Sequence, residues 1–527
     1  MNKTLTENRF MIYASSFFTP PFFTALFLAT LYFIFLNPYL DVRGFNADDP
    51  VSYLSKGLSL WRGIGYGEQF ANVFMPVTAQ PLFFSLMLAP IVGIFGINFV
   101  AFKLFMVFLA LLLGFATYRF FTYFLRDDQL AFLLTLILMS SPIIFGLSHR
   151  VLAEVPLYLF AVLALLTLDR YLRENSPVFS SGLWISSLLL GVSYLTKQTS
   201  ISIWFGGWFL ILFPQFRKKI VLIKLIVYTM VGFVPIAIWH GWASTVPDDL
   251  WYWTTPSARD FFDQNPLNPT GGLISLSDFL IRMRHNVVWG IANNSAMVLF
   301  APFYFTEGRL LGFVLSVPIV VWFAWQWVKS FRKHPSVLEG FVFSGLSLLL
   351  MKYGGFAARY SALMYPAFLV YAARGIEVFR SKIRILILSS IIFVSMSTTI
   401  LIALDQARNP YGSKVLNDYI AVGEQAKKLF PKDSKCAVPL LTHWQILTGH
   451  QSFYDRKTKV ENLSGDLAYV VGLSDKAPQD LRLFKDLDRH VLSDAQIIRN
   501  SVNRQPEVFE KIYENQTYAI FKVVHHD

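Results

Sequence analysis

Residues 101–124 read AFKLFMVFLALLLGFATYRFFTYF. A helix needs about 20 predominantly apolar residues to cross a bilayer, and this stretch is long enough to do so. Ten further candidate spans lie between residues 17 and 404, namely Phe17–Leu36, Leu130–Gly146, Val155–Tyr171, Leu183–Tyr194, Ile201–Phe213, Ile220–Trp239, Leu310–Val328, Val337–Met351, Ala362–Ile376 and Ile383–Leu404. The sequence therefore predicts an α-helical polytopic membrane protein with about 11 transmembrane helices.

The composition supports this class. The chain has 527 residues, of which 54% are hydrophobic and 15% are charged, and its mean hydropathy is +0.46. An average soluble protein carries about 25% charged residues. These values exclude a disordered chain, a collagen and a disulfide scaffold, and they argue against a soluble enzyme. The single cysteine, Cys436, excludes an intramolecular disulfide and a cysteine-based metal centre.

The positive charge follows the apolar part of the chain. Residues 1–404 hold 29 Lys and Arg against 18 Asp and Glu, whereas residues 405–527 hold 17 against 16. Cytoplasmic loops of membrane proteins are enriched in Lys and Arg. Basic clusters alternate between the spans in a way that puts the N-terminus inside and the C-terminus outside: Lys3/Arg9, Arg170/Arg173, Arg217–Lys219, Lys329–Lys333 and Arg380–Arg384. This distribution does not resemble a nucleic-acid-binding surface.

Three outer segments follow from this topology. Residues 1–404 form the predicted membrane domain, with a large first outer loop at 37–100 and a second at 240–289. Within or beside these loops, Pro81–Phe95 and Val287–Phe303 are expected to be interfacial helices. Residues 405–527 are predicted to fold as a small extracytoplasmic α/β domain, with strands near 435–441, 467–473 and 518–524 and helices near 415–429 and 479–491.

Paired carboxylates stand in the first outer loop, where Asp48 and Asp49 precede Pro50. Such a pair suits general-base chemistry or cation binding. The alternative is structural, because Asp before Pro is a good start for a helix. Tyr53 follows on the same segment.

A second polar group follows the third span and contains His149, Arg150 and Glu154. Charges near membrane depth usually face a protein cavity and are candidates for function. The structural alternative is a salt bridge between Arg150 and Glu154 at helical i,i+4 spacing. His149 alone is more typical of a hydrogen-bonded interfacial residue than of a ligand.

Three cations oppose the positive-inside rule, because they fall on short outer connections: Lys197, Lys352 and Arg359. An anion such as a phosphate would account for them. A lysine that extends its side chain to the interface is the alternative for Lys197. No Walker loop, dinucleotide fingerprint, nucleophile elbow or HExxH motif occurs.

The order of these features resembles the GT-C glycosyltransferases that use polyprenyl-phosphate sugars, including the bacterial aminoarabinose transferases and the protein O-mannosyltransferase-like proteins. The residues that carry the resemblance are Asp48, Asp49 and Tyr53, then Gln80–Phe83, Glu154, Thr196–Lys197 and Arg359–Tyr360 before Pro366. The best match covers residues 38–200. Where the aminoarabinose transferases carry an acidic-Lys-Pro-Pro run, this chain has Thr78-Ala79-Gln80-Pro81, so a carboxylate and a lysine are missing.

The resemblance implies an inverting glycosyltransferase at the outer face of a bacterial cytoplasmic membrane. Its donor would be a polyprenyl-phosphate sugar, and its acceptor a lipid, a glycan or a protein. Asp49, Asp48 and Glu154 would be the catalytic candidates, while substrate would be bound by Tyr53, Gln80, His149, Arg150, Lys197, Lys352, Arg359 and Tyr360. No cofactor is assigned, and a divalent metal is left open. The alternative from another class is a flippase or transporter of lipid-linked saccharides, with the same charges lining a path.

Overall fold

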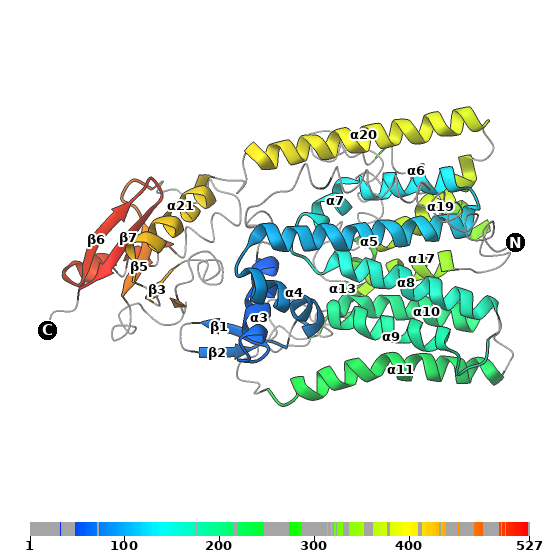
Figure 1. Ribbon diagram of the computed structural model, residues 1–527, viewed down its shortest axis with the longest axis horizontal. Coiled ribbons are helices and arrows are strands. Elements are labelled where there is room, and N and C mark those ends of the chain that lie inside the picture. The colour runs from blue at the N-terminus through cyan, green and yellow to red at the C-terminus, as the bar shows by residue number, and fades with distance from the viewer. Residues whose placement is uncertain are drawn as a thin grey trace, which may run out of the picture. The chain divides into compact units, whose positions relative to one another are not determined.

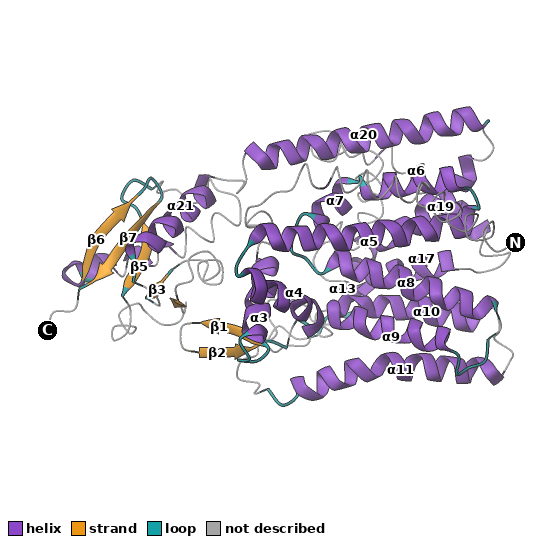
Figure 2. Cartoon of the chain, viewed as in Figure 1, coloured by secondary structure: helices purple, strands orange, loops and turns teal. Residues whose placement is uncertain are grey.

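A computed structural model provides the fold of the chain (Figures 1 and 2). It describes Tyr32 and residues 48–70, 73–78, 80–174, 176–213, 219–246, 273–285, parts of 314–329, 337–351, 362–376, 380–408, 414–431, 434–438, 451–453, 468–477 and most of 495–524. The chain divides into two compact units. Unit 1 comprises residues 1–36, 78–84 and 103–404, and unit 2 comprises residues 37–77, 85–102 and 405–527.

Unit 1 is a bundle of helices. In chain order these are α5 (Phe99–Leu125), α6 (Asp128–Met139), α7 (Pro142–Ser148), α8 (Glu154–Arg173), α9 (Ser181–Thr196), η1 (Gln198–Ser200), α10 (Ile201–Leu212), α11 (Lys219–Ala243), α13 (Leu276–His285), α17 (Val337–Met351), η7 (Ala362–Met364), α19 (Tyr365–Ile376) and α20 (Ser381–Arg408). Helix α9 packs between α8 and α11, and α10 packs on α17 (Figure 1).

Among the described residues, four helices are long and apolar enough to cross a membrane: α5, α8, α11 and α20. The prediction of a polytopic helical membrane protein agrees with these four helices. The predicted number of about 11 spans is not confirmed, because several of them correspond to shorter apolar helices such as α9 and α10. Only Tyr32 of the predicted span Phe17–Leu36 is described, and the predicted span Leu310–Val328 is described only in part, where its described residues are helical.

The predicted span at residues 130–146 is a broken helix. Helices α6 and α7 meet at 67°, because Pro142 has no N–H with which to continue the α6 ladder. The carbonyl of Leu138 is satisfied instead by Ser141, whose hydroxyl donates to it at 2.7 Å. The carbonyl of Ser140 accepts two hydroxyls from α20, those of Ser395 at 3.2 Å and Thr399 at 2.7 Å. Side-chain hydroxyls therefore satisfy the backbone carbonyls at the bend, where no water is available inside a membrane.

Glycines bring two helix pairs of unit 1 into backbone contact. A Cβ built on Gly206 of α10 would collide with the carbonyl oxygen of Gly340 on α17, and one on Gly191 of α9 would lie 2.6 Å from the carbonyl of Gly232 on α11. Small residues at such crossings allow the close packing that drives helix association in lipid.

Residues 37–77 and 85–102, from the predicted first outer loop, form the N-terminal part of unit 2. It contains α3 (Asp48–Trp61), the antiparallel hairpin of β1 (Gly67–Phe70) and β2 (Val73–Pro76), and α4 (Leu82–Phe95), of which residues 85–95 belong to this unit. Helix α3 ends in a Schellman motif, in which Ile64 N–H donates to the Ser59 carbonyl and Gly63 adopts a φ of +70°. The helix predicted at Pro81–Phe95 is present as α4, whereas the one predicted at Val287–Phe303 lies outside the described residues.

The C-terminal part of unit 2 is a five-stranded mixed sheet with the order β4-β3-β5-β7-β6 (Figure 2). Its elements are α21 (Lys414–Leu429), β3 (Lys435–Ala437), β4 (Gln451–Phe453), β5 (Tyr469–Leu473), η10 (Pro506–Val508), β6 (Phe509–Glu514) and β7 (Tyr518–Val523). Strands β3, β4 and β5 run parallel, and β7 is antiparallel to β5 and β6. The three predicted strands and the helix predicted at 415–429 are confirmed. The helix predicted at 479–491 lies outside the described residues.

Candidate active site

An ion pair joins the start of α8 to the end of α9. Glu154 is the first residue of α8, and its side chain is fully buried. Lys197 follows α9 in extended conformation, and its ammonium lies 2.7 Å from Glu154 Oε1. The lysine side chain is 11% exposed. Burying either charge alone would cost several kcal/mol, so each makes the burial of the other tolerable.

Polar side chains continue from Lys197 into α10. Gln198, Thr199 and Ser200 form the 3₁₀ turn η1, and all three are buried. The hydroxyls of Thr199 and Ser200 have no hydrogen-bond partner among the described residues. Buried hydroxyls normally have one. This junction therefore has capacity to bind a polar group beside the ion pair.

The salt bridge expected between Arg150 and Glu154 does not have helical geometry. Helix α8 begins at Glu154 itself, and Arg150 lies in the preceding turn with a half-exposed side chain. The carboxylate of Glu154 pairs instead with Lys197, 43 residues further along the chain. The anion beside Lys197 is thus a carboxylate of the protein.

His149 lies in a buried cluster of unit 1. Its Nδ1 is 2.8 Å from the carbonyl oxygen of Phe145, and its Nε2 is 3.0 Å from that of Tyr32. The buried ammonium of Lys103 donates to the carbonyl of His149 itself at 2.6 Å. The expectation of a hydrogen-bonded His149 is confirmed. Lys103 was not singled out, since it stands alone within an apolar run.

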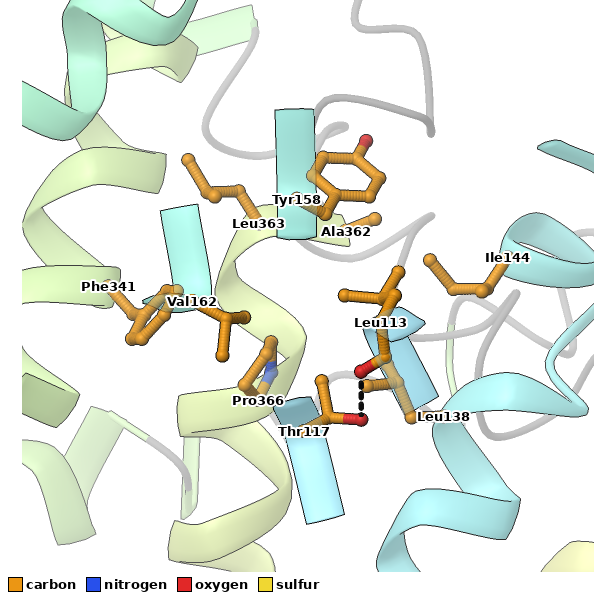
Figure 3. Close-up of a pocket in the computed structure, with 10 residues that line it drawn as sticks. All are labelled: Leu113, Thr117, Leu138, Ile144, Tyr158, Val162, Phe341, Ala362, Leu363 and Pro366. Atoms are coloured by element: carbon orange, nitrogen blue, oxygen red, sulfur yellow. Dashed lines mark hydrogen bonds between the residues drawn. The ribbon is translucent and has the colours of Figure 1, made fainter. Parts of the chain in front are cut away.

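Below Glu154, one turn along α8, Tyr158 lines a small apolar cavity (Figure 3). The cavity has a volume of about 10 Å³, which is close to the least that one water molecule needs. Its lining comes from α5, α6, α7, α8, α17, η7 and α19: Leu113, Thr117, Leu138, Ile144, Tyr158, Val162, Phe341, Ala362, Leu363 and Pro366. The Thr117 hydroxyl donates to its own helix at Leu113, so the lining offers mainly apolar contact.

In unit 2, the acidic pair opens α3. Asp48 and Asp49 are the first two helical residues, so the predicted helix start is confirmed. The Asp49 side chain is half-buried. Carboxylates in a first turn are favoured by the helix dipole, and a half-exposed carboxylate there also remains accessible to a substrate. Tyr53 is buried on the same helix.

A hydrogen-bonded chain runs from α3 to the hairpin. The Lys56 ammonium donates to Ser52 Oγ at 2.9 Å, and the Ser52 hydroxyl donates to the carboxylate of Glu68 on β1. Lys56 and Glu68 are both fully or almost fully buried. Burial lowers the pKa of Lys56 to about 8, while the carboxylates of Glu68 and Asp49 oppose that shift. The Lys56 ammonium also lies 5.0 Å from the ring centroid of Tyr53.

The other predicted site residues are described only in part. Gln80 precedes α4 and is half-buried in unit 1. Lys352, Arg359 and Tyr360 lie outside the described residues, as does the side chain of Asp48. Among the described residues, no group of three or more His, Cys, Asp or Glu side chains could hold a metal ion. Asp49 belongs to unit 2, and Glu154 and Lys197 belong to unit 1.

This arrangement of helices is that of a GT-C-type glycosyltransferase fold. The chain is similar to ArnT from Cupriavidus metallidurans bound to undecaprenyl phosphate, with a TM-score of 0.60, 11% identity, and coverage of 95% of this chain and 97% of that one. The apo structure of the same ArnT gives a TM-score of 0.59 at 11% identity with the same coverage.

A third similar structure is the Archaeoglobus fulgidus oligosaccharyltransferase in complex with Zn and sulfate. Its TM-score is 0.51 at 12% identity, over 85% of this chain and 67% of that one. No protein-family model and no curated protein sequence matches the chain. The likeness is therefore one of fold, and it agrees with the GT-C resemblance found in the order of the sequence features.

Proposed function

We propose that this chain is an inverting membrane glycosyltransferase that moves a sugar from a polyprenyl-phosphate donor to an extracytoplasmic lipid, glycan or protein. One observation carries the proposal: the fold is shared over nearly the full length of both chains with an ArnT whose structure holds undecaprenyl phosphate. The positive-inside pattern of Lys and Arg supports a bacterial cytoplasmic membrane with the site facing outward.

The reaction divides into two tasks. A base takes the proton of the acceptor hydroxyl as its oxygen attacks the anomeric carbon. The bond from that carbon to the phosphate oxygen breaks, and the polyprenyl phosphate leaves from the opposite face, which inverts the configuration. The phosphate gains negative charge in the transition state, so fixed cations stabilise the transition state more than the ground state.

Asp49 is the proposed base. It is a half-buried carboxylate in the first turn of α3, on a helix that is linked to Glu68 of β1 through Ser52 and Lys56. Asp48 is the second candidate and Glu154 the third. Glu154 is fully buried and paired with Lys197. This pairing suits a carboxylate that balances the lysine charge better than one that takes a proton from the acceptor.

The proposed donor site uses the cations at the outer connections. Lys197 is held by Glu154, and Lys352 and Arg359 would supply further charge to the phosphate. Arg150, Tyr53, Gln80 and Tyr360 complete the proposed substrate contacts, whereas both ring nitrogens of His149 are engaged by backbone carbonyls.

The test is a comparison of envelope glycans and lipid extracts between a deletion strain and its parent by mass spectrometry. The deletion should lose one glycan modification and accumulate the polyprenyl-phosphate sugar. An Asp49→Asn chain, present at normal abundance, should fail to restore the modification. Normal transfer in that strain, combined with failed movement of a lipid-linked saccharide across the membrane in the deletion, would favour the transporter instead.

A further inference from the structure

Apolar side chains are exposed where α3 and α4 end. Trp61 is the last residue of α3 and is 53% exposed, while Ile94 and Phe95, at the end of α4, are 69% and 59% exposed. Ile64 and Ile97, which follow the two helices, are exposed as well. We name these five residues the wedge surface. Nothing in the two helix ends requires exposed apolar groups, because their outward faces could carry polar residues at no cost to folding.

The five residues form one surface of unit 2. The Trp61 indole lies over Gly93, where a Cβ would overlap its ring, so the ends of α3 and α4 are in contact (Figure 1). Each helix is followed by a glycine in the left-handed region, Gly63 with φ +70° and Gly96 with φ +64°. The isoleucine after each glycine is then exposed next to the aromatic residue that ends the helix.

The chain itself indicates what covers this surface. Helix α5 begins at Phe99, two residues after Ile97, with Asn98 as its N-cap. It is 27 residues long, about 40 Å, which exceeds a hydrocarbon core of about 30 Å. Its exposed large apolar side chains lie on one stripe that a membrane must cover, namely Val100, Leu104, Phe108, Leu112 and Phe115. Ile94, Phe95 and Ile97 therefore lie within a few residues of a spanning segment.

The local charge also fits a membrane surface. No Asp or Glu occurs between Glu68 and Asp127, so no carboxylate from this stretch opposes anionic headgroups. Arg62 is exposed beside Trp61. Trp is favoured at the membrane–water interface, and a neighbouring arginine can reach the phosphates while its stem stays in apolar surroundings.

We propose that the wedge surface inserts into the outer leaflet and anchors the first-loop part of unit 2 to the lipid. Asp49 stands twelve residues before Trp61 on α3, about 18 Å along the helix axis. The anchor therefore holds that carboxylate within about 20 Å of the lipid headgroups. This last consequence rests on the proposed function, because a polyprenyl-phosphate donor presents its sugar at that level. The insertion itself does not depend on catalysis.

The test uses a fluorophore whose emission can be quenched from either side of the interface. Phe95→Cys and Ile94→Cys chains are labelled and reconstituted into vesicles of phosphatidylcholine and phosphatidylglycerol. The parent chain is the blank, since Cys436 is buried. Phe108→Cys, on the exposed stripe of α5, gives the membrane reference, and Asn503→Cys, exposed in the C-terminal part, gives the aqueous reference. Ile64→Cys reports on the same surface from a turn if the helix variants fold poorly.

Labels on the wedge surface should lose most of their emission to lipids that carry a nitroxide near the headgroup. They should lose little to iodide in the buffer, as the Phe108 label does. Quenching by iodide to the level of the Asn503 label would overturn the proposal. Resistance to both quenchers would also overturn it, because protein would then cover the surface. Neither result involves sugar transfer, so a failed anchor and a failed enzyme assignment remain distinguishable.

Discussion

The Lys197 ammonium and the Glu154 carboxylate are 2.7 Å apart across the α8–α9 pair, although the lysine follows the glutamate by 43 positions in the chain. The pair lies at the ends of two helices: α8 begins with Glu154, and Lys197 directly follows α9. On the predicted topology this connection is an outer one, where the charge distribution of membrane proteins disfavours a lysine, and the pairing with Glu154 accounts for Lys197 there.

The ion pair can be dissected with a double-mutant cycle. Glu154→Gln and Lys197→Met should each destabilise the chain by about 3–5 kcal/mol, because each leaves a buried charge without its partner. The double variant should recover most of that loss. Thermal unfolding in lipid nanodiscs measures the cycle. Additive single effects, with no recovery in the double variant, would contradict a direct pairing.

The same cycle separates structure from chemistry. If the pair serves the reaction, the double variant recovers stability but not transfer of sugar. Full recovery of transfer with stability would assign the pair to folding alone.

Asparagine substitutions distinguish a general base from a helix-stabilising carboxylate. Asn keeps the shape of Asp and its capacity to accept a hydrogen bond, but it cannot take a proton. Positioned bases contribute about 10²–10⁴-fold in rate. Asp49→Asn should therefore lose transfer by about that factor while folding and retaining the lipid donor. Asp48→Asn, the matched control one residue away, should show only a mild loss of stability. Parental rates in both variants would assign the pair to structure and make Glu154 the next candidate.

Lys56 should give the chain a pH dependence at alkaline pH. Its pKa in the folded chain is about 8, below the value near 10.4 expected when unfolded. The unfolded chain therefore binds more protons in this window, and the stability contribution of Lys56 rises between about pH 8 and pH 10. The stability of the parent relative to Lys56→Gln should increase over that range. Lys427→Gln, at an exposed lysine of α21, should show no such trend, and parallel curves for all three chains would contradict the prediction.

Helix contact through glycine predicts a sharp difference between two alanine substitutions. At Gly206 a Cβ would collide with the backbone of Gly340, so Gly206→Ala should destabilise the α10–α17 contact by about 1–3 kcal/mol. At Gly146 of α7 nothing lies within 4 Å of the added carbon. Gly146→Ala should therefore be neutral or slightly stabilising, since Ala favours helix over Gly. Equal unfolding temperatures for the two variants would show that the α10–α17 contact is looser than described.

Local patterns predicted the elements whose side chains follow a simple period. The apolar runs became helices, and the β-branched and aromatic runs near 469–473 and 518–523 became the central strands of the C-terminal sheet. The hairpin β1–β2 was not predicted, because its two strands have only four residues each and no clear alternation of apolar and polar side chains. The break at Pro142 was hidden inside a continuous apolar run.

The site depended on contacts between distant segments. Sequence spacing offered Arg150 as the structural alternative for a partner of Glu154, but the helix starts at Glu154 and leaves Arg150 outside it. Lys56 and Lys103 passed unnoticed, since burial of a lone lysine is decided by what packs around it. The pairing of Glu68 with Ser52 likewise depends on the fold, which brings β1 beside α3. Candidate residues were therefore visible in the sequence, whereas their partners were not.

The bend between α6 and α7 depends on a helix that is synthesised much later, α20. The carbonyl of Ser140 receives its hydroxyl donors from Ser395 and Thr399, which are synthesised 255 and 259 residues later. Until α20 enters the bilayer, this polar group has neither water nor those partners. The early helices therefore remain an incomplete assembly intermediate until 255 and 259 further residues have been synthesised. A nascent chain that stalls before α20 would display this defect inside the membrane, where a quality-control protease could recognise it.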